Sequence, residues 1–190
     1  MLSPSEAPVG SIFLVTSTGF NGRWIAAAQA FLRGEGSKYT HGGIVLSEGW
    51  IVEAEPGGAQ LRPVGTLEGR RNLLISDAPV QWWLRTSTFP ELYLAREQAE
   101  EKMRNRIDAA GRTLVGTPYS LRDFYALAAW EVDWPFKAWA RKRVEDSGHL
   151  ICSALIDKGL DRAGLHLYDD DRLPGDVTPG DLYEWIEEHG

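Results

Sequence analysis

The chain has 190 residues, of which 43% are hydrophobic and 25% are charged, and it carries a formal net charge of −7. This length and apolar content predict a single domain, 1–190, with one sizeable core. The acidic balance argues against broad binding to nucleic acid or to anionic membranes. One cysteine excludes a disulfide framework, and with only four scattered histidines no zinc-type metal site is expected.

The apolar runs of the chain are short. None approaches the length that crosses a bilayer, and 1–9 lack a basic segment leading into an apolar stretch of the signal-peptide type. We therefore expect a soluble protein without integral membrane association, either cytoplasmic or released without a classical signal peptide.

Hydrophobic patterning predicts strands that are grouped together and helices at both ends of the chain. Such segregation is typical of an α+β fold and not of alternating α/β units. In chain order the expected elements are a strand at 11–15, a helix at 22–33, strands at 41–46, 50–55, 60–64, 72–76 and 80–85, a long helix opened by Pro90, and an amphipathic helix that begins near Cys152.

The strands 41–46 and 50–55 form an expected hairpin that carries three ionisable residues. A three-residue loop at 46–48 pairs His41 with Glu53, whereas a loop at 47–49 pairs it with Glu55. In either register all three side chains share one face, because side chains alternate along a strand. An imidazole beside a carboxylate is the base and its orienting acid in a Cys/His/acid arrangement. We favour Glu53 as the acid, since a Pro-Gly-Gly turn ends the strand just after Glu55.

Two adjacent glycines follow His41. Gly42 and Gly43 cost stability inside a strand, and such glycines often mark a place where another backbone or a ligand approaches closely. They favour a functional interpretation of His41 over the alternative, a solvent-exposed histidine at a strand end.

The only cysteine, Cys152, stands at the start of the last expected helix, whose apolar residues recur at helical spacing. The unpaired N–H groups and the dipole of a first turn favour a thiolate, which predicts a reactive thiol partly exposed in a cleft. The alternative is an inert core cysteine, because free cysteine is among the most buried residue types. His149 is a second candidate base, although a loop histidine is more often exposed to solvent.

Four short segments follow one another in a characteristic order, and a weaker fifth closes the series: YTHGGIV at 39–45, IVEA at 51–54, GTPY at 116–119, ICSALI at 151–156 and VTPGDL at 177–182. In this order they resemble the circularly permuted NlpC-type branch of the papain-like cysteine hydrolases. The resemblance implies a permuted papain-like fold, in which an antiparallel sheet of five or six strands packs on the cysteine helix. It implies a triad of Cys152, His41 and Glu53, and it places Tyr119 at the oxyanion or substrate side, where Glu55 is a further candidate.

The implied activity is hydrolysis of a peptide-like amide, such as a cell-wall peptide, or of an ester. It proceeds through an acyl-enzyme and needs no metal or organic cofactor. Two alternatives stay open: acyl transfer or thioester hydrolysis on a lipid, as in the lecithin:retinol acyltransferase-like relatives, and a non-catalytic binding module on the same fold.

The segment at about 121–147 is expected to be an insertion rich in tryptophan and phenylalanine, and it ends near a basic run at 141–143. Aromatic and basic residues on one amphipathic helix favour a lid or a peripheral membrane contact. The alternative is that these rings pack the insertion onto the rest of the domain.

Overall fold

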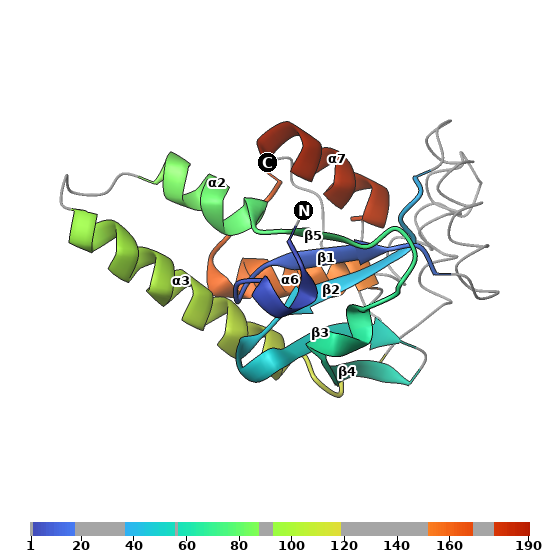
Figure 1. Ribbon diagram of the computed structural model, residues 1–190. Coiled ribbons are helices and arrows are strands. Elements are labelled where there is room, and N and C mark those ends of the chain that lie inside the picture. The colour runs from blue at the N-terminus through green and yellow to red at the C-terminus, as the bar shows by residue number, and fades with distance from the viewer. Residues whose placement is uncertain (1, 18–36, 56, 88–92, 119–151, 169–176) are drawn as a thin grey trace, which may run out of the picture.

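The computed structural model describes residues 2–17, 37–55, 57–87, 93–118, 152–168 and 177–190. These residues form an α+β fold in which one antiparallel five-stranded sheet has the order β4-β3-β2-β1-β5 (Figure 1). The expected fold class and the lower of the two expected strand numbers are thereby confirmed. The strands are β1 (Ile12–Val15), β2 (His41–Val45), β3 (Trp50–Glu55), β4 (Gly58–Pro63) and β5 (Leu74–Ser76).

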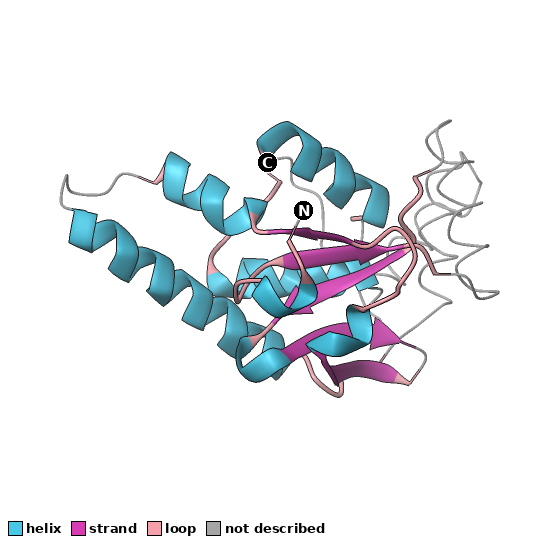
Figure 2. Cartoon of the chain, viewed as in Figure 1, coloured by secondary structure: helices cyan, strands magenta, loops and turns pink. Residues whose placement is uncertain are grey.

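Four α-helices and three short 3₁₀ segments surround this sheet in the part of the chain that the structure describes (Figure 2). The helices are α2 (Ala78–Thr86), α3 (Tyr93–Thr113), α6 (Cys152–Ala163) and α7 (Pro179–His189). The 3₁₀ segments are η1 (Pro4–Glu6), η2 (Ser47–Gly49) and η3 (Val64–Leu67). None of the described helices combines the length and the apolar character that a membrane span requires.

The two faces of the sheet are buried in separate apolar clusters, because side chains alternate along each strand. Even-numbered residues of the central strands join the larger cluster, which includes α6 and the inner side of α3. Odd-numbered residues join a smaller cluster beneath η3. The strand residues of the larger cluster include Ile12, Leu14, Ile44 and Val52, and those of the smaller one include Phe13, Val15, Val45, Ile51 and Ile75.

Helix α6 packs closely on β2, and glycines on both elements make this approach possible. A Cβ atom on Gly42 would lie 3.1 Å from Ile156 Cδ1, and one on Gly159 would lie 2.6 Å from Ile44 Cδ1. The close approach expected at Gly42 is therefore present: the atom nearest to a Cβ on Gly42 is the backbone carbonyl oxygen of Phe13 on β1, at 2.5 Å, and the cysteine helix lies next to it.

The expected strand at 80–85 was wrong, because α2 occupies these residues. The alternation around Trp82 and Trp83 suggested a strand, but Val80 and Leu84 are the buried residues of this stretch, at a spacing of one helical turn. Pro79 in the first turn is also a typical helix start. Burial of one helical face therefore decided the secondary structure of this stretch, in spite of its propensity for a strand.

Several expectations concern residues outside the described ranges. They are the helix at 22–33, the insertion at about 121–147 with its aromatic side chains, the first residues of the helix opened by Pro90, and the site candidates Tyr119 and His149.

Candidate active site

The turn between β2 and β3 fixes which residues of the hairpin face each other. Gly43 pairs with Glu53, and η2 occupies 47–49, so the loop is the second of the two expected alternatives. Continuing this register places His41 opposite Glu55. The His41 ring nevertheless contacts Glu53, since Nε2 lies 2.8 Å from Oε2 of that carboxylate. Diagonal neighbours on one face of an antiparallel pair are within reach of long side chains, which accounts for this contact.

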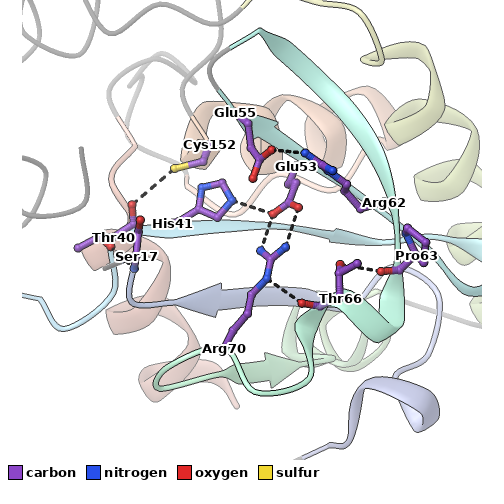
Figure 3. Close-up of polar contacts among 10 residues, drawn as sticks. All are labelled: Ser17, Thr40, His41, Glu53, Glu55, Arg62, Pro63, Thr66, Arg70 and Cys152. Carbon is purple, nitrogen blue, oxygen red and sulfur yellow. Dashed lines mark hydrogen bonds and ion pairs between the residues drawn. The ribbon is translucent and has the colours of Figure 1, made fainter. Parts of the chain in front are cut away.

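Cys152 is the first residue of α6, and it lies where β2 begins. Its Sγ atom is 4.0 Å from the carbonyl oxygen of Thr40, the residue before His41. In Figure 3 the sulfur is directed at this carbonyl oxygen, the His41 ring lies beside the cysteine side chain, and the ring's Nε2 faces Glu53. A hydrogen bond between the thiol and the imidazole joins the two side chains. The thiol is 3% exposed and belongs to the larger apolar cluster, so the expectation of a partly exposed thiol was wrong. The structure thus brings Cys152, His41 and Glu53 together, with the sulfur on the buried side.

Arg70 completes this group, and sequence analysis missed it. Its Nη1 donates to Glu53 Oε2 at 2.6 Å, and its Nη2 donates to Oε1 at 2.9 Å. The arginine stands on the connection between η3 and β5, which folds back over the odd-numbered face of the sheet. No motif or periodicity relates position 70 to position 53, so the sequence offered no signal for this pair.

The charges of the group follow from these contacts. Burial would raise the pKa of Glu53, but the hydrogen bonds and positive charges of Arg70 and His41 outweigh it and lower that pKa from 4.5 to about 2. Burial would lower the pKa of His41, but the hydrogen bonds and negative charges of Cys152 and Glu53 raise it from 6.5 to about 10. An ionised Glu53 can only accept, so Nε2 of His41 carries the proton between them. The other ring nitrogen, Nδ1, is then the one available to the thiol.

A hollow of about 340 Å³ lies beside the imidazole. His41, Glu55 and two arginines contribute its ionisable groups. Glu55 is half-buried here, and Oε2 of its carboxylate accepts from Arg62 at 2.7 Å. Among the described residues, those that line the hollow are Val15, Thr16, Ser17, His41, Glu55, Gly69, Arg70 and Arg71. Glu55 therefore lies on the open side of the site, whereas Glu53 lies beneath it.

His41, Glu53 and Glu55 also satisfy the distances of a metal-ligand set, since one ligand atom of each lies within 4.8 Å of the others. Their present partners disfavour that interpretation. Both oxygens of Glu53 accept from Arg70, and Glu55 accepts from Arg62. A cation would have to enter beside two guanidinium groups that already neutralise these carboxylates. The arrangement is thus better suited to orienting the imidazole than to binding a cation.

Comparison with known protein families and with curated proteins finds no match to this chain. What the site can do is therefore inferred from its residues. A thiol beside an imidazole that is itself bonded to a buried carboxylate can pass its proton to the ring, and the carboxylate stabilises the resulting ion pair.

Proposed function

We propose that this protein is a cysteine hydrolase that cleaves a peptide-like amide or an ester through Cys152, His41 and Glu53. The observation that carries the proposal is the meeting of three groups from three elements: the only thiol at the start of α6, the imidazole at the start of β2, and a carboxylate on β3 hydrogen-bonded to that imidazole. The permuted papain-like fold is part of the proposal, and the five-stranded antiparallel sheet packed on α6 supports it.

In the proposed mechanism His41 takes the thiol proton, and the sulfur of Cys152 attacks the substrate carbonyl carbon. The imidazolium then donates that proton to the leaving amine or alcohol as its bond to the carbonyl carbon breaks, which leaves a thioester. Water attacks the thioester and gives a proton to His41. The acid product departs as the carbon–sulfur bond breaks, and the free thiolate returns.

The remaining groups of the site stabilise the charges that form during these reaction steps. Glu53 orients the ring and stabilises the imidazolium, as the acid of a triad does. The backbone N–H of Cys152, in the first turn of α6, is suited to bind the oxyanion. By resemblance Tyr119 would add a hydroxyl there. The hollow beside His41 is the proposed entry for substrate.

The test is alkylation of the thiol with iodoacetamide at about pH 6, followed by intact-mass measurement, because the thiolate fraction controls the rate. With a single cysteine, one adduct reports Cys152 alone. We expect His41→Ala to react at least about 10-fold more slowly than wild type. His166→Ala is the matched control, since His166 pairs with Asp161 in an exposed ion pair outside this group.

Equal, slow alkylation of wild type and His41→Ala would remove the nucleophile assignment. Once a reactive thiol is established, product analysis with a lipid ester donor separates hydrolysis from acyl transfer. Release of free fatty acid supports the hydrolase, whereas transfer of the acyl group to an added amine or alcohol supports the acyltransferase alternative.

A further inference from the structure

We propose that Arg70 is a positioning residue of this site, which fixes the Glu53 carboxylate in the orientation that accepts Nε2–H of His41. The inference rests on the proposed function and extends it to a residue outside the Cys/His/acid set. It assigns Arg70 no contact with the reacting atoms.

The geometry at Glu53 supports this role. The side chain of Glu53 is completely buried, and its two oxygens each receive one N–H of the same guanidinium, at 2.6 and 2.9 Å. Such a bidentate pair defines the plane of the carboxylate as well as its position. His41 Nε2 approaches the same Oε2 atom that Arg70 Nη1 contacts. The arginine thus determines where the acceptor of the imidazole stands.

Arg70 is itself held in place. Its Nε donates to the carbonyl oxygen of Thr66 at 3.0 Å, and the hydroxyl of Thr66 donates to the carbonyl oxygen of Pro63 at 2.7 Å. The guanidinium also lies 6.0 Å from the centroid of the Phe13 ring. Figure 3 shows the arginine reaching from its loop across the sheet to Glu53, with Thr66 beside it. Two contacts of Arg70, with Thr66 and with the Phe13 ring, therefore pre-organise the group that orients the acid.

A second arginine pair on the same hairpin provides an internal comparison. Arg62 and Glu55 form a single contact of 2.7 Å, and their side chains are 44% and 33% exposed. A pair of that kind contributes little to stability. Arg62 does not touch Glu53 in any contact among the described residues, so its removal tests for a general effect of losing a nearby positive charge.

Among the described residues, ionisable groups from several neighbouring elements surround Glu53. They are His41 on β2, Cys152 on α6, Glu55 on the same strand, Arg62 on β4 and Arg70 itself. Without Arg70, burial acts on Glu53 with only the imidazole to oppose it, so the pKa of Glu53 rises. A protonated Glu53 no longer stabilises the imidazolium. Reactivity of the thiol should then disappear at a higher pH than in wild type.

The experiment measures the rate of Cys152 alkylation by iodoacetamide across the acidic and neutral range, with thermal unfolding of each variant as a check of folding. We expect Arg70→Gln to lower the rate and to move the low-pH limb of the profile upward by about 1 to 3 pH units. Arg70→Lys retains the charge but loses the bidentate contact, so it should lower the plateau and leave the limb near its wild-type position. Arg62→Gln should follow wild type.

A double variant separates positioning from packing. If Arg70 acts through Glu53, adding Arg70→Gln to Glu53→Gln should cause no further shift of the limb. A wild-type profile in Arg70→Gln would overturn the inference, as would a further shift in the double variant. If Arg70→Gln fails to fold, the test is Arg70→Lys. A folded Arg70→Lys whose alkylation rate reaches the wild-type plateau would also overturn the inference. Failure of the proposed function is distinguishable, because then wild-type alkylation would not depend on His41 at all.

Discussion

Glu53→Gln should change how the stability of this protein depends on pH. The pKa of Glu53 is lowered from 4.5 to about 2, because Arg70 and His41 stabilise its charged form. A depressed carboxyl pKa contributes stability that is present above pH 4.5 and lost as the pH falls through about 2. At about 1.4 kcal/mol per pKa unit the full contribution is about 3 kcal/mol, of which about 2 kcal/mol is lost between pH 6 and pH 3. Glutamine does not titrate, so this part of the pH dependence should disappear in the variant.

The assay is urea unfolding followed by circular dichroism at several pH values between about 6 and 3. Glu53→Gln also loses stability at every pH, because Arg70 is left without its acid. The quantity to compare between wild type and variant is therefore the change of the free energy of unfolding with pH. Repeating the pair in a His41→Ala background removes titration of the imidazole, and the contact with Arg70 persists there. Glu55→Gln is the control, because that half-buried side chain forms a single ion pair near the surface. Parallel loss of stability in wild type and Glu53→Gln would refute the assignment of Glu53 as an ionised, buried partner of two cations.

Two further predictions concern turnover and packing. Glu53→Gln should lower turnover of a cleaved substrate by about 100-fold or more, because Glu53 is the acid that contacts Nε2 of His41. Glu55→Gln should have a smaller effect. Steady-state kinetics of both variants check this order, and the reverse order would contradict it. Gly42→Ala should cost about 1 to 3 kcal/mol in urea unfolding, because its Cβ would lie 2.5 Å from the Phe13 carbonyl oxygen. Gly65→Ala is the control, since its Cβ would meet nothing within 4 Å, and an equal cost at both glycines would contradict the packing argument.

The β2–β3 hairpin shows what a period of two can predict. The loop could be placed in either of two positions, and each gave His41 a different residue directly across the hairpin. Both positions put His41, Glu53 and Glu55 on one face, so their proximity did not depend on the register. The observed loop is at 47–49, yet the contact runs diagonally to Glu53. Which residues share a face was therefore predictable, whereas which of two acids meets the ring depended on side-chain conformation.

Helix α2 shows where the same reasoning fails. A short apolar stretch fits both an alternating and a helical pattern, and length and flanking residues must decide between them. The paired tryptophans suggested the two faces of a strand, whereas the observed helix has Pro79 in its first turn. Trp82 packs edge-to-face on Trp185 of α7, at 5.6 Å between ring centroids. That contact joins positions more than 100 residues apart, so tertiary packing supplied what the local pattern lacked.

Arg70 marks a different limit. The hairpin places an acid beside a base, but local periodicity carries no information about what lies over the acid. A carboxylate with no exposed surface requires a partner for each oxygen, because an unpaired buried charge is costly. The imidazole can supply one donor only. Had the complete burial of Glu53 been known from the sequence, the need for a second donor would have followed, and an arginine, with its two parallel N–H groups, is the side chain best shaped to meet it. The residue that sequence analysis missed is thus the one that the buried acid requires.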